Sequence, residues 1–196
     1  MTERTIIQFF KELDRRLGVR AQVILLGASA GSLMGHIRPS LDIDFEIRLS
    51  RTAARALRKD LDRIIRDAAS VVGVAVNYSE DVSRWSMISY LDYQKTALPY
   101  RTFGKISVKL MAPEYWTIGK MARYLELDIR DMIRIIRKKR LKPGRLTRLW
   151  MRALRTSQLS LELGQFKEHI SHFLKTYGKK IWGPTFDAEK YRPSDS

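Results

Sequence analysis

The stretch LLGASAGSLMGHIRPSLDIDFEIRL, residues 25–49, decides the fold of this chain. Apolar and charged side chains alternate from residue 43 to residue 48, and this period of two predicts a strand over 41–49. A short apolar run over 23–26 ends at Gly27 and predicts a buried strand before it. Residues 27–35, GASAGSLMG, are too small and too rich in glycine for a strand, and they predict a turn that opens a short helix.

Hydrophobic periodicity extends this pattern along the rest of the 196-residue chain. It predicts helices over 6–17, 52–69, 113–140, 145–158 and 160–177, and strands over 71–78, 86–93 and 104–111. This order of elements predicts an α+β fold followed by a helical extension. We expect an α/β core over 1–112, a helical subdomain over 113–182 and a polar, disordered tail over 183–196.

Two carboxylates mark the predicted strand 41–49. Asp42 and Asp44 are two residues apart, so both side chains should lie on the same face, while Ile43 and Phe45 point into the core. Adjacent carboxylates repel each other unless a cation lies between them. Mg²⁺, or Mn²⁺ in its place, is the expected cation, because it takes oxygen ligands and often binds one or two carboxylates together with substrate phosphates.

The small-residue turn upstream of this pair is a candidate phosphate site. Small residues let backbone N–H groups approach a phosphate closely, and a helix that begins there adds its positive end. Ser29 and Ser32 add hydroxyl donors. Without a function, the carboxylate pair would be part of a solvated strand face and the small-residue stretch would be an ordinary turn. Their order on consecutive elements favours phosphoryl or nucleotidyl transfer instead.

Two ordered motifs carry a family resemblance over residues 20–140. The first, G-[GAS]-[ST]-A followed by R-x-[ST]-x-D-[IL]-D-[FL], is matched by Gly27, Ala28, Ser29, Ala30, Arg38, Ser40, Asp42, Ile43, Asp44 and Phe45. The second, APEYWTIGK followed by DIRD, supplies Glu114, Lys120, Asp128 and Asp131. The chain thereby resembles the DNA polymerase β-like nucleotidyltransferases. Within them it is most similar to the AbiEii branch, which comprises toxins of type IV toxin–antitoxin pairs and their relatives.

The resemblance implies a nucleotidyltransferase-type mixed sheet flanked by helices, and transfer of an NMP group from an NTP to an acceptor. It implies that Asp42 and Asp44 bind the metal ion and that Lys120 neutralises phosphate charge. The implied nucleotide-binding residues are Gly27, Ser29, Ser32, Arg38, Asp128 and Asp131. It also implies growth inhibition and an antitoxin protein as a partner. From the residues alone, Lys120 can equally be a surface lysine, and Asp128 and Asp131 can stabilise a helix N-terminus.

One departure from the family pattern bears on activity. Many enzymes of this superfamily carry a third carboxylate on a later strand, and the predicted strand 104–111 has none. Asp92, on the preceding predicted strand, is the nearest candidate. Two carboxylates favour a single metal ion and leave open a catalytically inactive protein that binds nucleotides or nucleic acid. A transferase acting on a protein or on a cationic small molecule is a third alternative, and the basic charge disfavours the cationic substrate.

The strongly basic composition points to a polyanionic partner. The formal net charge is +16, and residues 130–155 contain a single acid, Asp131, among eleven basic side chains. The basic residues recur at helical spacing, which predicts two basic stripes for a nucleic-acid backbone, with RNA, such as a tRNA end, as the expected acceptor. The predicted contacts are Arg137, Lys138, Arg145, Arg148, Arg152 and Arg155. Trp150 and Tyr124 are candidates for base stacking, although a core role is the expected one for both.

The remaining composition excludes several classes of protein. Without cysteine the chain has no disulfide, thiolate zinc site or cysteine nucleophile, which fits a reducing cytoplasm. No apolar stretch is long enough to cross a bilayer, and no secretory signal is visible. The three histidines do not form a metal-binding set.

Overall fold

The computed structural model describes residues 1–35, 40–82 and 86–193. The chain divides into two compact units. The sheet unit comprises Met1–Val82 and Gln94–Met111, and the helical unit comprises Ser83–Tyr93 and Ala112–Ser196. The predicted core over 1–112 therefore corresponds to the sheet unit, except that one segment inside it groups with the helices instead.

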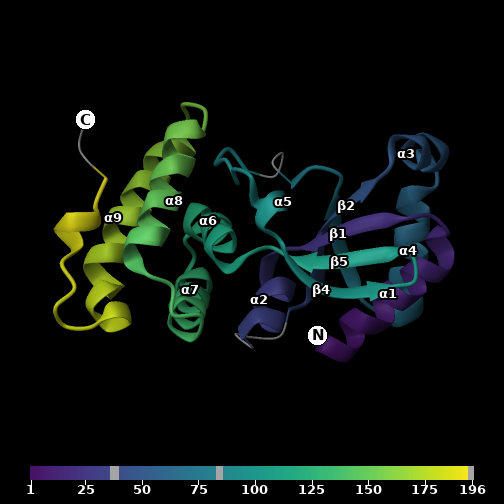
Figure 1. Cartoon of the computed structure of the whole chain (residues 1–196), viewed down its shortest axis with the longest axis horizontal. Helices are drawn as coiled ribbons and strands as arrows, with labels where there is room; N and C mark the ends of the chain where they lie inside the picture. The colour runs from purple at the N-terminus through teal and green to yellow at the C-terminus, as the bar shows by residue number, and fades with distance from the viewer. Residues whose placement is uncertain (36–39, 83–85, 194–196) are drawn as a thin grey trace. The chain divides into compact units, whose positions relative to one another are not determined.

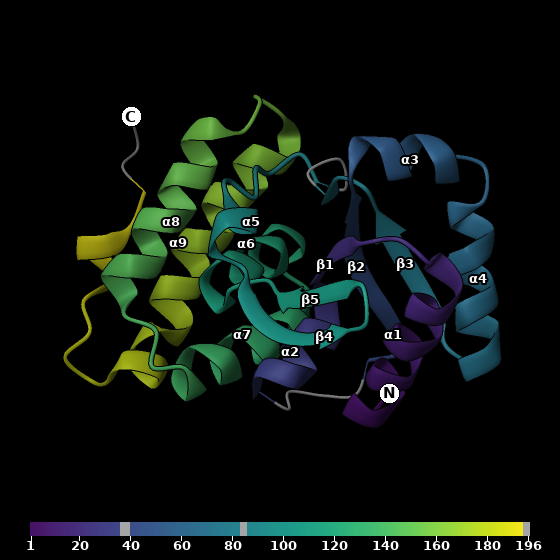
Figure 2. The same ribbon diagram turned by 45° about the vertical axis from the view of Figure 1, so that its right-hand side comes forward.

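The sheet unit is a five-stranded mixed sheet with flanking helices, so the α+β class is confirmed. Its elements are α1 (Glu3–Leu17), β1 (Ala21–Leu25), α2 (Gly27–Gly35), β2 (Asp42–Leu49), α3 (Arg51–Leu57), α4 (Leu61–Val72), β3 (Ala75–Ser79), β4 (Leu98–Phe103) and β5 (Ile106–Leu110). The strand order is β3-β2-β1-β5-β4, in which β1 is antiparallel to β2 and parallel to β5. The ribbons show α1 and α4 side by side along this sheet (Figure 1, Figure 2).

The core of the sheet unit forms where the apolar stripe of α1 meets β2. Phe9 and Phe10 contact Phe45 at ring-centroid distances of 5.7 Å and 5.9 Å, and all three rings are fully buried. Ile43 and Ile47 are fully buried as well. The alternation along β2 therefore places its apolar residues in the core, as predicted, and leaves the residues between them for the opposite face.

The helical unit consists mainly of four helices. They are α6 (Pro113–Arg123), α7 (Glu126–Lys138), α8 (Pro143–Thr156) and α9 (Leu161–Trp182), and Pro113 lies in the first turn of α6, as expected. Trp150 is fully buried in their core, and its indole nitrogen donates a hydrogen bond of 2.9 Å to Thr117 Oγ1. Its expected core role is thus confirmed. No helix in the described part of the chain is long and apolar enough to cross a membrane.

Two predicted elements of the sheet unit differ from the structure, and one of its strands was not predicted. The helix predicted over 52–69 is two helices, because α3 is rich in alanine and has no buried residue, and the apolar stripe begins only at Leu61. The predicted strand 71–78 begins later, at Ala75, after Gly73 ends α4 in a left-handed conformation. The structure adds β4, which the sequence did not predict. Pro99 is tolerated there because β4 is an edge strand, where a missing N–H leaves no ladder bond unmade.

The predicted strand 86–93 was wrong. Ser86 and Ser89 accept hydrogen bonds from the backbone of residues two further along, and Leu91 adopts a positive φ of 56°. Such local side-chain bonds compete with strand formation. The segment ends in the short helix α5 (Tyr93–Thr96), so Asp92 lies in a turn of the helical unit.

Two corrections apply to the helical unit. The helix predicted over 113–140 is interrupted at Tyr124, which has a φ of 54° and caps α6, so that α7 begins at Glu126. The segment from 183 to 193, predicted to be disordered, contains the 3-10 helix η2 (Ala188–Tyr191). Phe186 packs against Trp182 and stacks on Tyr191, at centroid distances of 4.8 Å and 5.3 Å.

Candidate active site

The candidate site begins with the carboxylate pair on β2. Asp42 and Asp44 are both half-buried on the face opposite Phe45. Asn77, which faces Asp44 across the parallel β2–β3 pair, donates from Nδ2 to Asp42 Oδ2 at 2.6 Å and to Asp44 Oδ1 at 3.2 Å. One amide group therefore bridges the two carboxylates, which confirms that they lie side by side. Sequence reasoning missed Asn77, because the pairing of β3 with β2 was not known.

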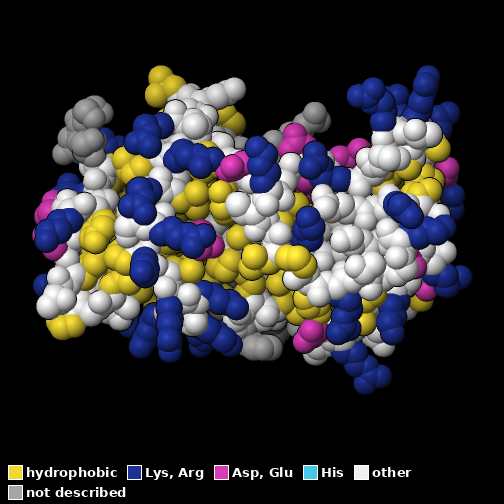
Figure 3. All heavy atoms as spheres, viewed as in Figure 1, with side chains coloured by type: hydrophobic (Ala, Val, Ile, Leu, Met, Phe, Trp, Pro, Cys, Tyr) yellow, Lys and Arg dark blue, Asp and Glu magenta, His cyan; other side chains and the backbone are white. Residues whose placement is uncertain are grey.

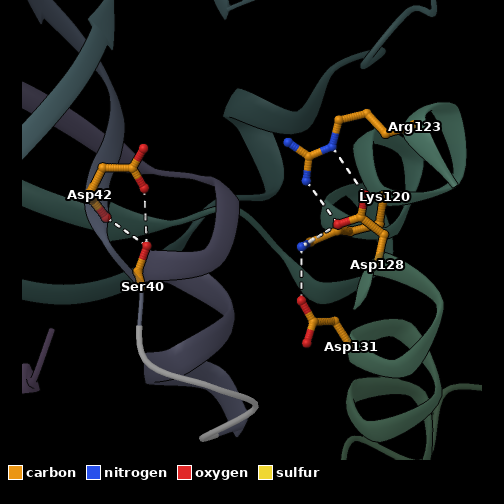
Figure 4. A network of polar contacts seen from close by, with 6 residues as sticks. All are labelled: Ser40, Asp42, Lys120, Arg123, Asp128 and Asp131. Carbon is orange, nitrogen blue, oxygen red and sulfur yellow. Dashed lines mark hydrogen bonds and ion pairs between the residues drawn. The ribbon is translucent and has the colours of Figure 1, made fainter. Parts of the chain in front are cut away.

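A serine just before β2 holds the first carboxylate of the pair. Ser40 Oγ lies 2.7 Å from the backbone oxygen of Asp42 and 3.2 Å from its Oδ1, so this hydroxyl can donate to either atom (Figure 4). The side chain of Ser40 is itself buried. Ser40, named by the family motif, thus positions Asp42. Arg38, a predicted nucleotide contact, lies outside the described residues.

Gly27 sets the distance between the glycine turn and the second carboxylate. The backbone N–H of Leu26 donates to the backbone oxygen of Asp44 at 2.9 Å, and α2 begins at the next residue. A Cβ on Gly27 would lie 1.8 Å from Asp44 Oδ2, and Gly27 has a positive φ of 50°. Glycine is therefore required by both the close approach and the backbone conformation. The N-terminus of α2, which carries partial positive charge, lies directly beside Asp44.

The two serines of this turn are placed differently. Ser29 is fully buried, and its Oγ donates to the backbone oxygen of Leu26 at 3.0 Å. The Ser29 hydroxyl is thus bonded to the carbonyl just before α2, inside the protein, and its contact with a triphosphate stays a prediction. Ser32 is half-buried in the middle of the same helix. Ser32 and the backbone of the turn stay predicted phosphate-binding groups.

Replacing Gly27 by Ala should displace the Asp44 carboxylate. We expect a loss of about 2–4 kcal/mol in the free energy of unfolding, from the positive φ and the steric overlap together, and weaker binding of Mn²⁺ by calorimetric titration. Gly18→Ala is the matched control, because Gly18 has a similar φ of 68° but no atom within 4 Å of an added Cβ. Equal effects of the two substitutions on stability and on Mn²⁺ affinity would contradict a role for Gly27 beside Asp44.

Glu46 is a third carboxylate on β2 that sequence reasoning did not single out. It continues the period of two from Asp42 and Asp44, which was the available signal. Glu46 is fully buried and accepts hydrogen bonds of 3.0 Å from the Val82 backbone and from Gln94 Nε2. Both partners belong to the sheet unit, so these bonds join β2 to the last residue before and the first residue after the segment that groups with the helices. Glu46 thus has a structural role in the sheet unit.

The donor set at the carboxylate pair fits a hard divalent cation. Two carboxylates offer oxygen ligands, and a half-turn of the Asn77 amide would exchange its nitrogen for its oxygen at the same place. Within residues 1–35, 40–82 and 86–193, no group of three His, Cys, Asp or Glu side chains is arranged to hold a metal ion. The candidate side-chain donors at this site are Asp42, Asp44 and the amide of Asn77.

Asp92, the candidate for a third carboxylate, forms its described side-chain contacts within the helical unit. It lies in the helical unit, where Arg152 donates to it at 2.5 Å and the hydroxyl of Tyr115 at 3.1 Å. Burial raises the pKa of Asp92, but hydrogen bonds from its own backbone, from Arg152 and from Tyr115 outweigh this and hold the pKa below its ordinary value. Asp92 is thus an ionised partner of α8.

The second motif forms a buried charge network in the helical unit. The ammonium group of Lys120 donates to Asp128 Oδ1 at 2.7 Å and to Asp131 Oδ2 at 2.9 Å (Figure 4). Arg123 donates to both oxygens of Asp128, at 2.9 Å and 3.2 Å. Lys120 is only 2% exposed, so it is not a surface lysine. Its ammonium lies 5.1 Å from the ring centre of Trp116.

This network joins α6 to the first turns of α7. Asp128 lies in the first turn of α7, where a negative charge is favourable, while Leu125 caps the helix without a side-chain bond. Two buried carboxylates thus neutralise the Lys120 ammonium group within the helical unit, and a role of Lys120 at a phosphate stays a prediction. Asp128 pairs with Lys120 and Arg123, and Asp131 pairs with Lys120, while their role at a nucleotide likewise stays a prediction.

The predicted basic stripes are exposed on the helical unit. On α8, Arg145, Arg148, Arg152 and Arg155 lie at intervals of three and four residues, and all four are exposed. Arg145 pairs with Glu114 at 3.1 Å, and Arg152 pairs with Asp92. On α7, Arg137 and Lys138 are exposed in the last turn. Tyr124, the other stacking candidate, is covered by the ring of His169 at 4.4 Å.

Comparisons of the chain with protein-family models, with curated proteins and with solved structures each found no match.

Proposed function

We propose that this protein is a metal-dependent nucleotidyltransferase that moves an NMP group from an NTP to an acceptor hydroxyl. The observation that carries this proposal is the pair Asp42 and Asp44 directly beside the N-terminus of α2, at a glycine that admits no side chain. The arrangement combines a cation site with backbone donors for a phosphate on consecutive elements. The order of elements and the motif resemblance to nucleotidyltransferases support the same reading.

Each residue of the sheet site has a defined part in this mechanism. Asp42, Asp44 and the amide oxygen of Asn77 would hold Mg²⁺ or Mn²⁺, which when bound neutralises charge on the triphosphate. Backbone N–H groups at the start of α2 bind a phosphate oxygen, and Gly27 keeps their approach open. The acceptor oxygen forms a bond to the α-phosphorus as the bond to the β-phosphate oxygen breaks. The products are the nucleotidylated acceptor and pyrophosphate.

The decisive experiment follows both products of this reaction. Purified protein is incubated with each α-labelled NTP, Mg²⁺ and total RNA, and the label on RNA and the pyrophosphate released are measured. We expect both to appear with at least one NTP. The proposal would be overturned if, with all four nucleotides tested, no label were transferred to any macromolecule and no NTP were bound.

A second candidate function is a catalytically inactive protein that binds a nucleotide or nucleic acid. Asn77, a neutral amide, stands beside the carboxylate pair where a third acid would strengthen the metal site. This alternative predicts NTP binding at Asp42 and Asp44 without release of pyrophosphate. The adjacent, half-buried carboxylates favour the active enzyme, because a protein without a cation has no need to keep two repelling charges together.

RNA is the acceptor that the charge of the helical unit favours. Exposed arginines on α8 offer contacts to a phosphate backbone, and each neutralised phosphate of a single strand contributes about −0.7 to the slope of log K against log salt. An antitoxin partner and a role in growth inhibition rest on the family resemblance alone. Pull-down of a neighbouring gene product with the Asp42→Asn variant would test them.

Substitution of the α8 stripe should weaken the salt dependence of RNA binding. With Arg145, Arg148, Arg152 and Arg155 all changed to Gln, we expect the slope to fall by up to about three units. Because Arg145 and Arg152 already have acidic partners, the double variant Arg148→Gln/Arg155→Gln, which removes two contacts worth about 1.4 units, should account for most of the fall seen in the fourfold variant. An unchanged slope in the fourfold variant would show that α8 is solvated surface.

A further inference from the structure

An open pocket of about 300 Å³ lies where α7 ends and α8 begins, beside the last turn of α9. Arg137, Arg140 and Lys142 provide its charge, and Ile136, Ile181 and Trp182 provide apolar surface. Among the described residues that line it, none is acidic. Unlike Arg145 and Arg152 of the α8 stripe, its three cations form no recorded ion pair with any residue that the structure describes. Figure 3 shows Lys and Arg side chains gathered along the lower edge of the helical unit.

Arg140 occupies a backbone position that normally belongs to glycine. Its φ is 51°, and two hydrogen bonds close the end of α7 around it, from Arg140 N–H to Arg137 O and from Leu141 N–H to Ile136 O. This is the Schellman motif, in which glycine is the usual left-handed residue because it carries no Cβ penalty. An arginine kept there despite the strain points to a use for its guanidinium.

Contacts with Leu141 and Phe186 fix the orientation of Trp182, whose indole lines the pocket. Its Nε1 donates to Leu141 O at 2.9 Å, and Phe186 covers it at a centroid distance of 4.8 Å. Phe186 fits only because residue 178 is glycine, since a Cβ there would lie 2.2 Å from the Phe186 ring. The segment after α9 therefore fixes the orientation of Trp182, and the half-buried indole lines the pocket beside three cations.

We propose that this pocket binds single-stranded RNA, with a base stacked on Trp182 and the flanking phosphates held by Arg137, Arg140 and Lys142. Aromatic stacking next to basic side chains is how proteins bind single strands with little sequence preference. The proposal deepens the proposed function by assigning the acceptor a place on the helical unit. It also moves the stacking residue from Trp150, which is buried, to Trp182.

The pocket fits RNA better than other polyanions. An acidic peptide would pair with the three cations but would leave the indole without a matching planar group. An anionic membrane is usually bound by apolar side chains that project from the surface, whereas the indole of Trp182 is half-buried and held by Leu141 and Phe186. A nucleotide provides both the planar base and the phosphate that this lining requires.

The test separates stacking from charge with two probes. The probes are a fluorescein-labelled oligoadenylate of about 12 nucleotides and an abasic strand with the same number of phosphates. Binding is measured by anisotropy over a range of salt concentrations without NTP or Mg²⁺. We expect Trp182→Leu to weaken oligoadenylate binding about 5- to 150-fold at an unchanged salt slope, and to leave abasic-strand binding unaltered. Tyr177→Leu, on the same helix but away from the pocket, is the control.

Charge at the pocket is tested by a matched pair of triple variants. Arg137→Gln/Arg140→Gln/Lys142→Gln should lower the salt slope by about two units. The control, Arg51→Gln/Arg55→Gln/Lys59→Gln on or just after α3, removes the same net charge from exposed positions of the sheet unit and should leave the slope nearly unchanged. Equal effects of the two triple variants would show that net charge alone drives binding and would overturn the proposal.

Arg140→Gly adds an independent readout. Glycine relieves the left-handed strain, so the melting temperature should rise, while RNA affinity should fall because one phosphate contact is lost. Unchanged RNA affinity in folded Trp182→Leu, or tighter binding to poly-glutamate or to phosphatidylserine vesicles than to RNA, would overturn the proposal. Because binding is measured without NTP, this failure is distinguishable from a failure of nucleotidyl transfer, which is scored by pyrophosphate release.

Discussion

Changing both Asp42 and Asp44 to Asn is expected to abolish nucleotidyl transfer. The two carboxylates are the charged ligands of the candidate metal site, and metal-assisted charge neutralisation is worth several kcal/mol in the transition state. A loss on the order of 10³-fold or more in pyrophosphate release therefore follows. Calorimetric titration should show that Mn²⁺ binding is lost in the same variant.

The fold should survive this double substitution. Removing two adjacent like charges relieves repulsion, while the charge-assisted bonds from Asn77 to both carboxylates are lost. These effects oppose each other, so we expect the free energy of unfolding to change by less than about 1 kcal/mol. Glu162→Gln/Glu168→Gln on α9 is the control for net charge, because both side chains are exposed. Transfer that persists in the Asp42/Asp44 variant would place the catalytic metal elsewhere.

Removing the buried charge of Lys120 is expected to have the largest effect on stability. Lys120→Met keeps most of the side-chain volume but leaves Asp128 and Asp131 without their shared partner, at oxygens that now lie 2.7 Å and 2.9 Å from the ammonium group. Breaking a buried ion pair from one side typically destabilises a protein by about 3–5 kcal/mol, because it leaves uncompensated charge in the interior. Arg123, which contacts Asp128 and is itself largely exposed, can offset only part of this.

Chemical denaturation of three variants separates charge from packing. Adding Asp128→Asn and Asp131→Asn to Lys120→Met should restore most of the lost stability, because no buried charge then remains unpaired. Lys175→Met, at an exposed position of α9, should change stability by less than about 0.5 kcal/mol. If Lys120→Met is no more destabilising than Lys175→Met, the network is not a structural element, and a role at phosphate for Lys120 regains support.

The sequence determined those features that depend on neighbours along the chain. Alternation over β2 determined that Asp42 and Asp44 share one face while Ile43 and Phe45 lie in the core, because side chains on a strand alternate. Helical periodicity gave the apolar stripe of α1. The period of two also places Glu46 on the face of Asp42 and Asp44. A local sequence pattern does not predict that Glu46 is buried or that it bonds to Val82 and Gln94.

Only the tertiary structure decided which distant residues meet. The parallel pairing of β3 with β2 brings Asn77 to the carboxylate pair, and a strand pattern does not state its own partner. The packing of α6 against α7 makes Lys120 a buried ion-pair partner and not the surface lysine that its sequence also allowed, because exposure depends on what packs over a helix face. Likewise, Phe186 closes over Gly178 and orders a segment whose polar sequence predicted disorder. In each case the deciding contact joins residues that local periodicity treats independently.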